Sequence, residues 1–366
     1  MYQRLSAPGR ARLGVVARLS GGLAALALIL ASCTGGAGQA PSAGSGGSPS
    51  PASLPASSSP ASPGSASSAP AGTITLYTSV TQGTVDAVVA AFKQAHPGTN
   101  VTVFRAATAA LAARIAADQR GGRVQADILW LTDPLSIQAY AAQGLLKSWQ
   151  PAGAAAIAPA YRAATYWGTR FINMVMVKGS SLTPGPLAWH DLADPAYQGA
   201  VGISDPGFAG SAFGALGYFA QTTGFGTDFY KALKANGATQ VQAPDDVTTG
   251  VATGRFKVGM TIDNSVENAI AKGSPVQIVW PSDGAIAMYS PIGVIDATTA
   301  GPTAEAFVEF VLSDPGQRAI SATGWEPIES GAGGPAIGGP QVYPDWTTAY
   351  GQQQQLLTEY RSIFGG

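Results

Sequence analysis

The stretch TITLYTSVTQGTVDAVVAAFKQAHP, residues 73–97, joins a short β-type run to a helix. Its first six residues, 73–78, form the run. In the part that follows, 80–96, apolar residues recur at helical spacing: Val85, Val88, Val89 and Phe92. Pro97 and Gly98 stop the helix. The stretch therefore predicts one strand followed directly by one helix.

The same order of strand and helix recurs along the rest of the chain. Further strands are expected at 101–104, 126–131, 171–177, 200–203, 258–262 and 277–280. Further helices are expected at 108–119, 134–143, 212–221, 227–234, 248–253, 265–271 and 304–312. Such alternation predicts α/β domains in which helices cover parallel sheets. The folded part, roughly 290 residues, is long enough for two such domains.

The N-terminal segment resembles a bacterial lipoprotein signal. Four arginines and no acidic residues precede an apolar stretch that begins at Leu19: Arg4, Arg10, Arg12 and Arg18. The stretch ends in Leu30-Ala31-Ser32-Cys33, and Cys33 is the only cysteine. The alternative, a transmembrane anchor, is less favoured because the apolar stretch is shorter than the ~20 residues that span a bilayer.

This resemblance implies that residues 1–33 are a signal peptide and that Cys33 carries lipid at the new N-terminus. Residues 34–72 are almost entirely Gly, Ser, Ala and Pro, which predicts a disordered linker. The protein is then expected on the extracellular face of the cell membrane, held by its lipid anchor. The bias toward Ala, Gly and Pro is consistent with a high-GC bacterium.

Charge and motif content exclude several function classes. Of 20 Lys and Arg residues, four lie in the signal, which leaves 16 against 21 Asp and Glu and a net charge of −5. Nucleic acid is therefore not an expected partner. The sequence shows no Ser-His-Asp order, zinc-ligand spacing, phosphate-binding glycine motif or Gly-x-Ser-x-Gly signature. We expect no enzyme and no cofactor, and a tethered hydrolase is the least favoured alternative.

Several segments, in this order and spacing, resemble the extracellular solute-binding proteins of ABC importers. They are 85–97, 126–128 (ADI), 142–149 (AQGLLKSW) and 304–318 (AEAFVEFVLSDPGQR), and 343–364 resembles a C-terminal helix of the same proteins. The resemblance is greatest to the branch that contains ferric-iron-binding and phosphonate-binding proteins. It implies a two-lobed type II periplasmic-binding-protein fold, with a hinge of crossing strands and a ligand cleft between the lobes. It also implies a monomer that delivers a small solute to an ABC permease.

The resemblance further implies how the chain is divided. The expected parts are lobe 1 at 73–165 and 283–335, lobe 2 at 166–282, and a C-terminal helical segment at 336–366. The lobes are expected to close over ligand about strands near 164–171 and 278–283.

The fold predicts that ligand lies beyond the carboxyl ends of the strands, where helix N-termini favour anions and polar oxygens. Four loops fall there, at 78–82, 106–108, 131–134 and 204–213. Their candidate ligand-binding residues are Ser79, Thr81, Thr108, Thr132, Asp133, Gly210, Ser211 and Ala212. The loop 204–213 (SDPGFAGSAF) resembles the one by which relatives hold a synergistic anion. Helix capping is the competing interpretation of the hydroxyl and carboxyl groups.

Four further candidate ligand-binding residues lie on strands or at their ends: Arg170, Asp263, Asn264 and Tyr289. The guanidinium of Arg170 suits bidentate pairing with phosphonate, sulfonate or carboxylate, and a salt bridge between lobes is the alternative. Asp263, next to Asn264, suits an ammonium or hydroxyl group, or caps the following helix. Aromatic residues could either flank ligand or belong to the core: Trp130, Trp167, Phe208 and Tyr289.

Iron is disfavoured by the residues at the expected ligand positions. Ferric-binding relatives place a His or acid after strand one, a Glu after strand three, and a Tyr pair after an Asn-rich strand end. Here the corresponding positions fall at Val80 or Thr81, at Thr132, and at 265–266 (Ser-Val). These side chains lack the hard anionic oxygens that suit ferric ion. We therefore expect no metal, and an organic anion or zwitterion such as a phosphonate. Sugar, polyamine and a surface sensor or adhesin on the same fold remain open.

Overall fold

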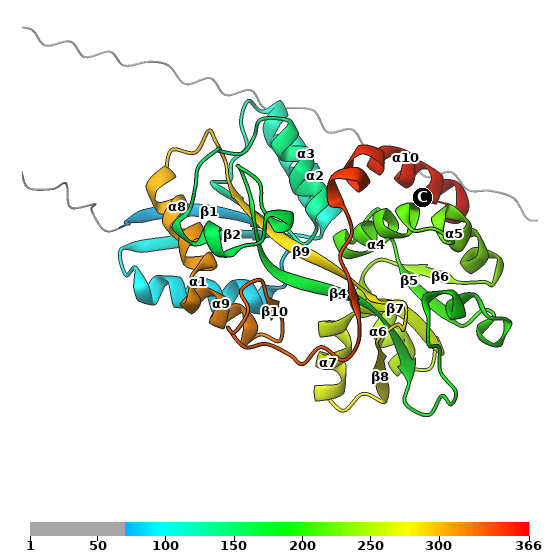
Figure 1. The fold of residues 1–366 in the computed structure, drawn as a ribbon. Coiled ribbons are helices and arrows are strands. Elements are labelled where there is room, and N and C mark those ends of the chain that lie inside the picture. The colour runs from blue at the N-terminus through cyan, green and yellow to red at the C-terminus, as the bar shows by residue number, and fades with distance from the viewer. Residues whose placement is uncertain (1–69, 366) are drawn as a thin grey trace, which may run out of the picture. The chain divides into compact units, whose positions relative to one another are not determined.

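The computed structural model describes residues 70–365, which form an α/β body (Figure 1). The predicted signal peptide, lipidated Cys33 and nearly all of the predicted linker lie outside these residues. Within the described part, no helix combines the length and apolarity needed to cross a membrane.

The strands form one sheet in the order β2-β1-β3-β9-β4-β7-β5-β6; β8 and β10 also pair with β4, and β11 pairs with β9. The strands are β1 (Gly72–Thr78), β2 (Thr99–Arg105), β3 (Ile128–Trp130), β4 (Trp167–Gly179), β5 (Val201–Ser204), β6 (Thr239–Val241), β7 (Val258–Ile262), β8 (Val276–Val279), β9 (Ala285–Val294), β10 (Glu326–Pro327) and β11 (Gln341–Val342).

The α-helices are α1 (Gln82–Ala95), α2 (Thr108–Arg120), α3 (Pro134–Ala142), α4 (Gly210–Gln221), α5 (Gly226–Ala235), α6 (Pro244–Ala252), α7 (Asp263–Ala271), α8 (Gly301–Leu312), α9 (Asp314–Ser321) and α10 (Trp346–Phe364). Short 3-10 helices span Ala152–Ala156, Pro159–Tyr161, Trp189–Ala193 and Pro195–Tyr197.

Two long strands, β4 and β9, cross from one lobe to the other. β9 pairs antiparallel with β3 of the first lobe, and β4 pairs antiparallel with β7 of the second. They also pair with each other, and Figure 1 shows them side by side through the middle of the body. Every residue of β9, and all but the last two of β4, are buried, because helices and loops cover both faces of the sheet.

The second crossing strand differs from the sequence prediction. A crossing strand was expected near 278–283, but that segment contains the end of β8 and the turn before β9. The sequence of β9 (AIAMYSPIGV) holds Ser290, Pro291 and Gly293, which weaken a strand pattern. Pro291 is tolerated because the β4–β9 register shifts beside it, between Gly168 and Phe171. The division into 73–165 with 283–335 and 166–282 stays a prediction.

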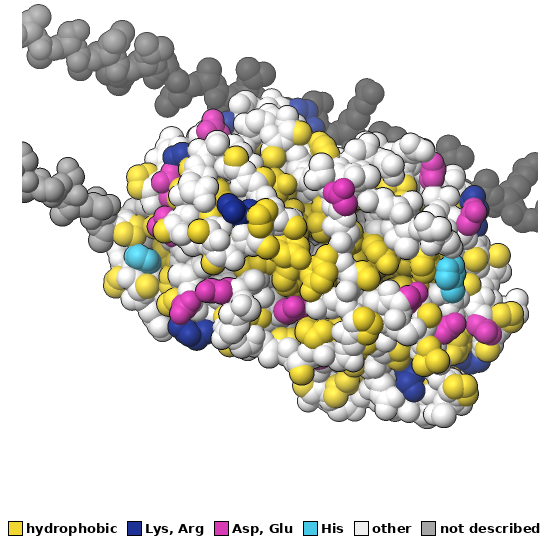
Figure 2. Space-filling model, viewed as in Figure 1, with side chains coloured by type: hydrophobic (Ala, Val, Ile, Leu, Met, Phe, Trp, Pro, Cys, Tyr) yellow, Lys and Arg dark blue, Asp and Glu magenta, His cyan; other side chains and the backbone are white. Residues whose placement is uncertain are grey.

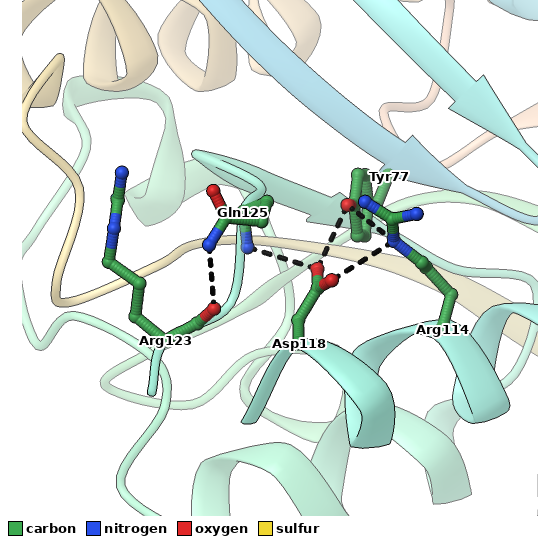
Figure 3. Close-up of polar contacts among 5 residues, drawn as sticks. All are labelled: Tyr77, Arg114, Asp118, Arg123 and Gln125. Carbon is green, nitrogen blue, oxygen red and sulfur yellow. Dashed lines mark hydrogen bonds and ion pairs between the residues drawn. The ribbon is translucent and has the colours of Figure 1, made fainter. Parts of the chain in front are cut away.

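The first lobe is braced by one carboxylate between β1 and α2. Asp118 accepts a hydrogen bond from the hydroxyl of Tyr77 at 2.9 Å and from the backbone N–H of Gln125 at 3.1 Å. It also pairs with the Nε of Arg114 at 3.0 Å, and Arg114 donates to the Tyr77 hydroxyl (Figure 3). These contacts fix the direction of α2, whose N-terminus points to the space between the lobes.

The C-terminal helix α10 packs against α3 of the first lobe and α4 and α5 of the second. Asp345 caps its first turn by accepting from the N–H groups of Thr347 and Thr348. Figure 2 shows few charged side chains on this face, and those of one sign do not gather into a patch. This agrees with the 11% content of charged residues.

Candidate ligand-binding site

A cavity of about 530 Å³ lies between the lobes, within the range of small-molecule sites. Residues from the first turns of five helices, or from the positions just before them, border it: Thr81, Thr108, Gly210, Pro244 and Asn264, at α1, α2, α4, α6 and α7. Each helix N-terminus presents unpaired N–H groups and a partial positive charge. The cavity is therefore suited to an anionic group.

At the N-terminus of α4 the second lobe contacts the first. No side chain caps this helix, whose N-cap residue is Ala209. A Cβ atom on Gly210 would lie 2.6 Å from Oδ2 of Asp133 and 2.9 Å from the Oγ1 atoms of Thr108 and Thr132. A larger residue would press on these three side chains, so glycine lets α4 approach the first lobe here.

Hydroxyl groups line the first-lobe side of the cavity. The Oγ of Ser79 lies 3.1 Å from Oγ1 of Thr132. Oγ1 of Thr84 lies 2.9 Å from that of Thr81 and 3.0 Å from that of Thr323. Because a hydroxyl both donates and accepts, this row can bind polar oxygens of either character.

Arg170 is a fully buried cation that borders the cavity. Its Nη1 donates to Oγ1 of Thr84 at 3.3 Å, and its guanidinium carbon lies 3.9 Å from the ring centroid of Trp325. Nε and Nη2 have no hydrogen-bond partner among the described residues, and no ion pair within 4.0 Å involves Arg170 there. Burial lowers its pKa to about 9, which leaves it cationic at neutral pH.

The model of the bacterial extracellular solute-binding protein family matches residues 74–326. That range contains every residue that borders the cavity. The chain belongs to this family.

Two relatives in sequence match parts of this solute-binding protein. A protein of Haemophilus influenzae of uncharacterised function is 29% identical over 135 residues, 36% of this chain and 39% of its own length. A protein of Salmonella paratyphi A, provisionally named a 2-aminoethylphosphonate-binding periplasmic protein, is 26% identical over 214 residues, 55% of this chain and 61% of its own. The chain thus spans less than two thirds of either relative.

Solved structures share the fold over most of the chain. AfuA from Actinobacillus pleuropneumoniae, with fructose-6-phosphate bound, has a TM-score of 0.72 at 19% identity, over 80% of this chain and 98% of its own. Iron-bound HitA from Pseudomonas aeruginosa has a TM-score of 0.71 at 21% identity, over 80% of this chain and 99% of its own. The predicted two-lobed type II periplasmic-binding-protein fold is confirmed.

Eight of the twelve ligand-binding residues predicted from sequence border the cavity of the solute-binding protein: Ser79, Thr81, Thr108, Thr132, Arg170, Gly210, Ser211 and Asn264. Of the four aromatic candidates, Phe208 also borders it, with 44% of its surface exposed. Trp130, Trp167 and Tyr289 are buried in the core.

The other four predicted residues do not border the cavity. Asp133 caps α3 by accepting from the N–H of Ser136 at 2.7 Å. Asp263 accepts from Nδ2 of Asn173 at 2.9 Å and from the N–H of Asn264 at 2.8 Å. Ala212 is buried in α4, and Tyr289 packs among other aromatic rings. Both carboxylates serve as structural acceptors here, the interpretation that the sequence had left open.

The structure adds polar and aromatic residues to the cavity that sequence reasoning missed: Thr84, Arg105, Gln242, Asp245, Asp246, Asn268, Thr323 and Trp325. Thr84 and Asn268 lie one helical turn after Thr81 and Asn264, so helical spacing could have found them. Asp245 and Asp246 lie in the first turn of α6, where a capping role is the usual interpretation. Trp325 carries no local signal, since only the fold brings it to Arg170.

Asp263 makes the stability of the protein depend on pH. Burial raises its pKa from 3.8 to about 7, so the folded protein binds this proton more tightly than the unfolded chain. Its contribution to stability is present below about pH 4 and is lost as pH rises through 7. Between pH 5 and 6.5 the free energy of unfolding is expected to fall by about 2 kcal/mol from this group, at ~1.4 kcal/mol per pH unit.

The variant D263N isolates this effect, because asparagine has no proton to lose in this range. Denaturant unfolding of both proteins from pH 4 to 8 gives the difference in slope. Burial also raises the pKa of Asp133 to about 6. The pH dependence of stability that comes from Asp133 therefore remains in D263N. Parallel pH profiles for the two proteins would contradict the prediction.

Proposed function

We propose that this protein is the substrate-binding component of an ABC importer and that it binds a small organic anion or zwitterion, such as a phosphonate or a phosphate ester. The observation that carries the proposal is Arg170. It is a buried cation with two nitrogens, Nε and Nη2, that have no hydrogen-bond partner in the described part of the chain, at a cavity where five helices begin. An unsatisfied buried guanidinium is costly, and an anionic ligand would supply the acceptors that it lacks.

The anionic group is expected to approach Arg170 and the N-terminus of α4 together. Two oxygens of a phosphonate match the fork geometry of a guanidinium. A third oxygen can accept from N–H groups at Gly210 and Ser211, in the uncapped first turn of α4. Arg170 lies on the crossing strand β4 and donates to Thr84 of the first lobe, whereas Gly210 and Ser211 lie in the second, so one anion held by all three would join the lobes and favour closure.

The cavity also carries acidic side chains that suit a ligand with a positive group. Asp245 and Asp246 border it from the second lobe, and Asp246 also accepts from the backbone N–H of Ala243 at 3.1 Å. They take the role that sequence reasoning gave to Asp263. The provisional name of the Salmonella relative, which specifies 2-aminoethylphosphonate, and the fructose-6-phosphate bound to AfuA support a phosphorus oxyanion.

Iron is the ligand of the similar structure HitA, but the electrostatics of this cavity oppose a metal cation. A buried Arg170 and several helix N-termini would repel Fe³⁺. Ser265, which stands at one position of the expected tyrosine pair, is buried, and its hydroxyl lies 2.8 Å from that of Thr248. Its side chain is therefore engaged within the second lobe.

The same proposal includes the location of the protein. The family is extracellular by name, and the lipoprotein-like signal ending at Cys33 supports a lipid anchor in the outer face of the cell membrane. A tethered monomer would remain near the permease that it serves. The alternative on the same fold is a surface sensor or adhesin.

A thermal-shift screen tests the ligand class. The purified protein is heated with methylphosphonate, 2-aminoethylphosphonate, sugar phosphates, amino acids, polyamines or ferric salts. A phosphonate or phosphate ester at ten times its dissociation constant is expected to add ~1.4 kcal/mol to the free energy of unfolding. Stabilisation by ferric salt alone would overturn the proposal. Stabilisation by none of these compounds would favour the sensor or adhesin.

A further inference from the structure

The partner of Arg170 is an aromatic ring. Trp325 lies between α9 and β10, and 2% of its surface is exposed. Its ring centroid is 3.9 Å from the guanidinium carbon, which places the cation over the face of the ring. An aromatic face attracts a cation most strongly where both are removed from water.

This stacking leaves the hydrogen-bond donors of Arg170 unused. The N–H groups of a guanidinium lie in its plane, around its edge, whereas Trp325 covers its face. Thr84 accepts from Nη1 only, and Nε and Nη2 have no partner among the described residues. A carboxylate partner, which binds a guanidinium edge-on, would instead occupy those in-plane donors and neutralise the charge.

The nearby carboxylates are held by amide groups instead. Asp263 accepts from Nδ2 of Asn173 at 2.9 Å. Glu326, the residue after Trp325, accepts from the same Nδ2 at 3.0 Å and from Nε2 of Gln341 at 2.8 Å. Neither forms an ion pair with Arg170. The amides thus satisfy both acids without consuming the donors of the guanidinium.

Two sets of contacts fix the position of Trp325. β10 pairs with β4 so that Pro327 lies opposite Arg170, which places Trp325 close to this arginine. Nδ2 of Asn264, in the second lobe, donates to the carbonyl of Gly324 at 2.9 Å. The ring therefore stands beside a contact between the lobes.

We propose that Trp325 is a positioning residue that sets the affinity of the cleft for anions. It stabilises the charge of Arg170 from the face and leaves the edge open, so that the ligand completes the hydrogen bonds of the guanidinium. The inference rests on the proposed function, because it takes Arg170 as the anion-binding group.

The test compares W325F, which keeps an aromatic face, with W325L, which removes it. Calorimetric titration with methylphosphonate is expected to show about 10-fold weaker binding for W325L, equivalent to ~1.4 kcal/mol. W325F is expected to stay within about 3-fold of the wild type. Equal losses in the two variants, or none in W325L, would overturn the proposal.

A spectroscopic signature separates positioning from simple loss of packing. The NMR signal of the Arg170 Nε–H is identified by its absence in R170K. Because the guanidinium carbon lies 3.9 Å from the ring centroid of Trp325, the ring is expected to shield this proton, and the signal is expected to move downfield in W325L but much less in W325F. Added methylphosphonate is expected to move the wild-type signal downfield as Nε gains an acceptor. An Nε–H signal unaffected by W325L would refute the role of Trp325. If the signal differs between W325L and the wild type, but methylphosphonate does not shift it in the wild type, the proposed function would be refuted instead.

W346L is the matched control for loss of a buried tryptophan. Trp346 is 5% exposed, lies at the start of α10 and does not border the cavity. Its replacement is expected to lower stability while leaving both the affinity for methylphosphonate and the Arg170 signal unchanged. If W346L reproduced both changes seen in W325L, the effect would be general loss of packing and the proposal would fall.

Discussion

Replacing Arg170 by methionine is expected to weaken phosphonate binding by about 100- to 1,000-fold. Removing one partner of a desolvated, hydrogen-bonded charge pair costs roughly 2–5 kcal/mol, and each 1.4 kcal/mol is tenfold in affinity. Calorimetric titration with the phosphonate that gives the largest thermal shift measures the loss. R170K, which keeps a charge but not the fork geometry, is expected to fall between the wild type and R170M.

The same substitution is expected to make the unliganded protein more stable. Arg170 is fully buried, and its Nε and Nη2 have no partner among residues 70–365, so its hydrogen-bond donors are incompletely satisfied before ligand binds. Methionine fills a similar space without that desolvation cost, and a gain of about 1–3 kcal/mol is expected. Denaturant unfolding of the two unliganded proteins measures it. A substitution that raises stability but weakens binding indicates that the arginine serves ligand binding rather than the fold.

R162M is the matched control. The Nε of Arg162 is also buried without a partner, but the residue does not border the cavity. R162M is expected to leave phosphonate affinity unchanged. If R170M bound the phosphonate as tightly as the wild type, the proposed site would be wrong.

The fold could be predicted because, over most of the chain, the local hydrophobic patterns match the alternation of strands and helices that the fold requires. The strand at 73–78 and the helix after it appear in the structure as β1 and α1. β9 escaped prediction because Pro291 and Gly293 are poor strand residues. Its pairing with β3 and β4, remote in sequence, outweighs that local weakness.

The part of the site that could be predicted is the part that lies where strands end and the following helices begin. This rule placed hydroxyl groups at the cavity, whereas Arg170 was predicted from the pairing chemistry of its guanidinium at the start of a strand. The rule does not predict whether an aspartate binds ligand or caps a helix, because both roles place the same residue at the same position in the sequence. Asp133 turns to Ser136, and Asp263 turns to Asn173, 90 residues away in sequence. Trp325 and Arg170 likewise meet only through the pairing of β10 with β4.

Gly210 gives the second large effect, through closure of the lobes. In G210A, the added Cβ would stand 2.6 Å from Oδ2 of Asp133 and 2.9 Å from the Oγ1 atoms of Thr108 and Thr132. Overpacking costs about 1–3 kcal/mol, and the upper end is expected because three atoms of the opposite lobe must move. Since ligand binds tightly only when the lobes close, the affinity for a phosphonate is expected to fall about 100-fold. Titration calorimetry with the same phosphonate measures it.

G83A separates closure from any general effect of removing a glycine. Gly83 also borders the cavity, in the first turn of α1, and a Cβ there would meet nothing within 4 Å. G83A is therefore expected to bind phosphonate like the wild type. Unliganded G210A is expected to be as stable as the wild type. Alanine favours a helix, and the lobes can separate slightly to admit the methyl group. Loss of stability without loss of affinity would show that Gly210 serves the fold, and that anion binding does not depend on how closely α4 approaches Asp133.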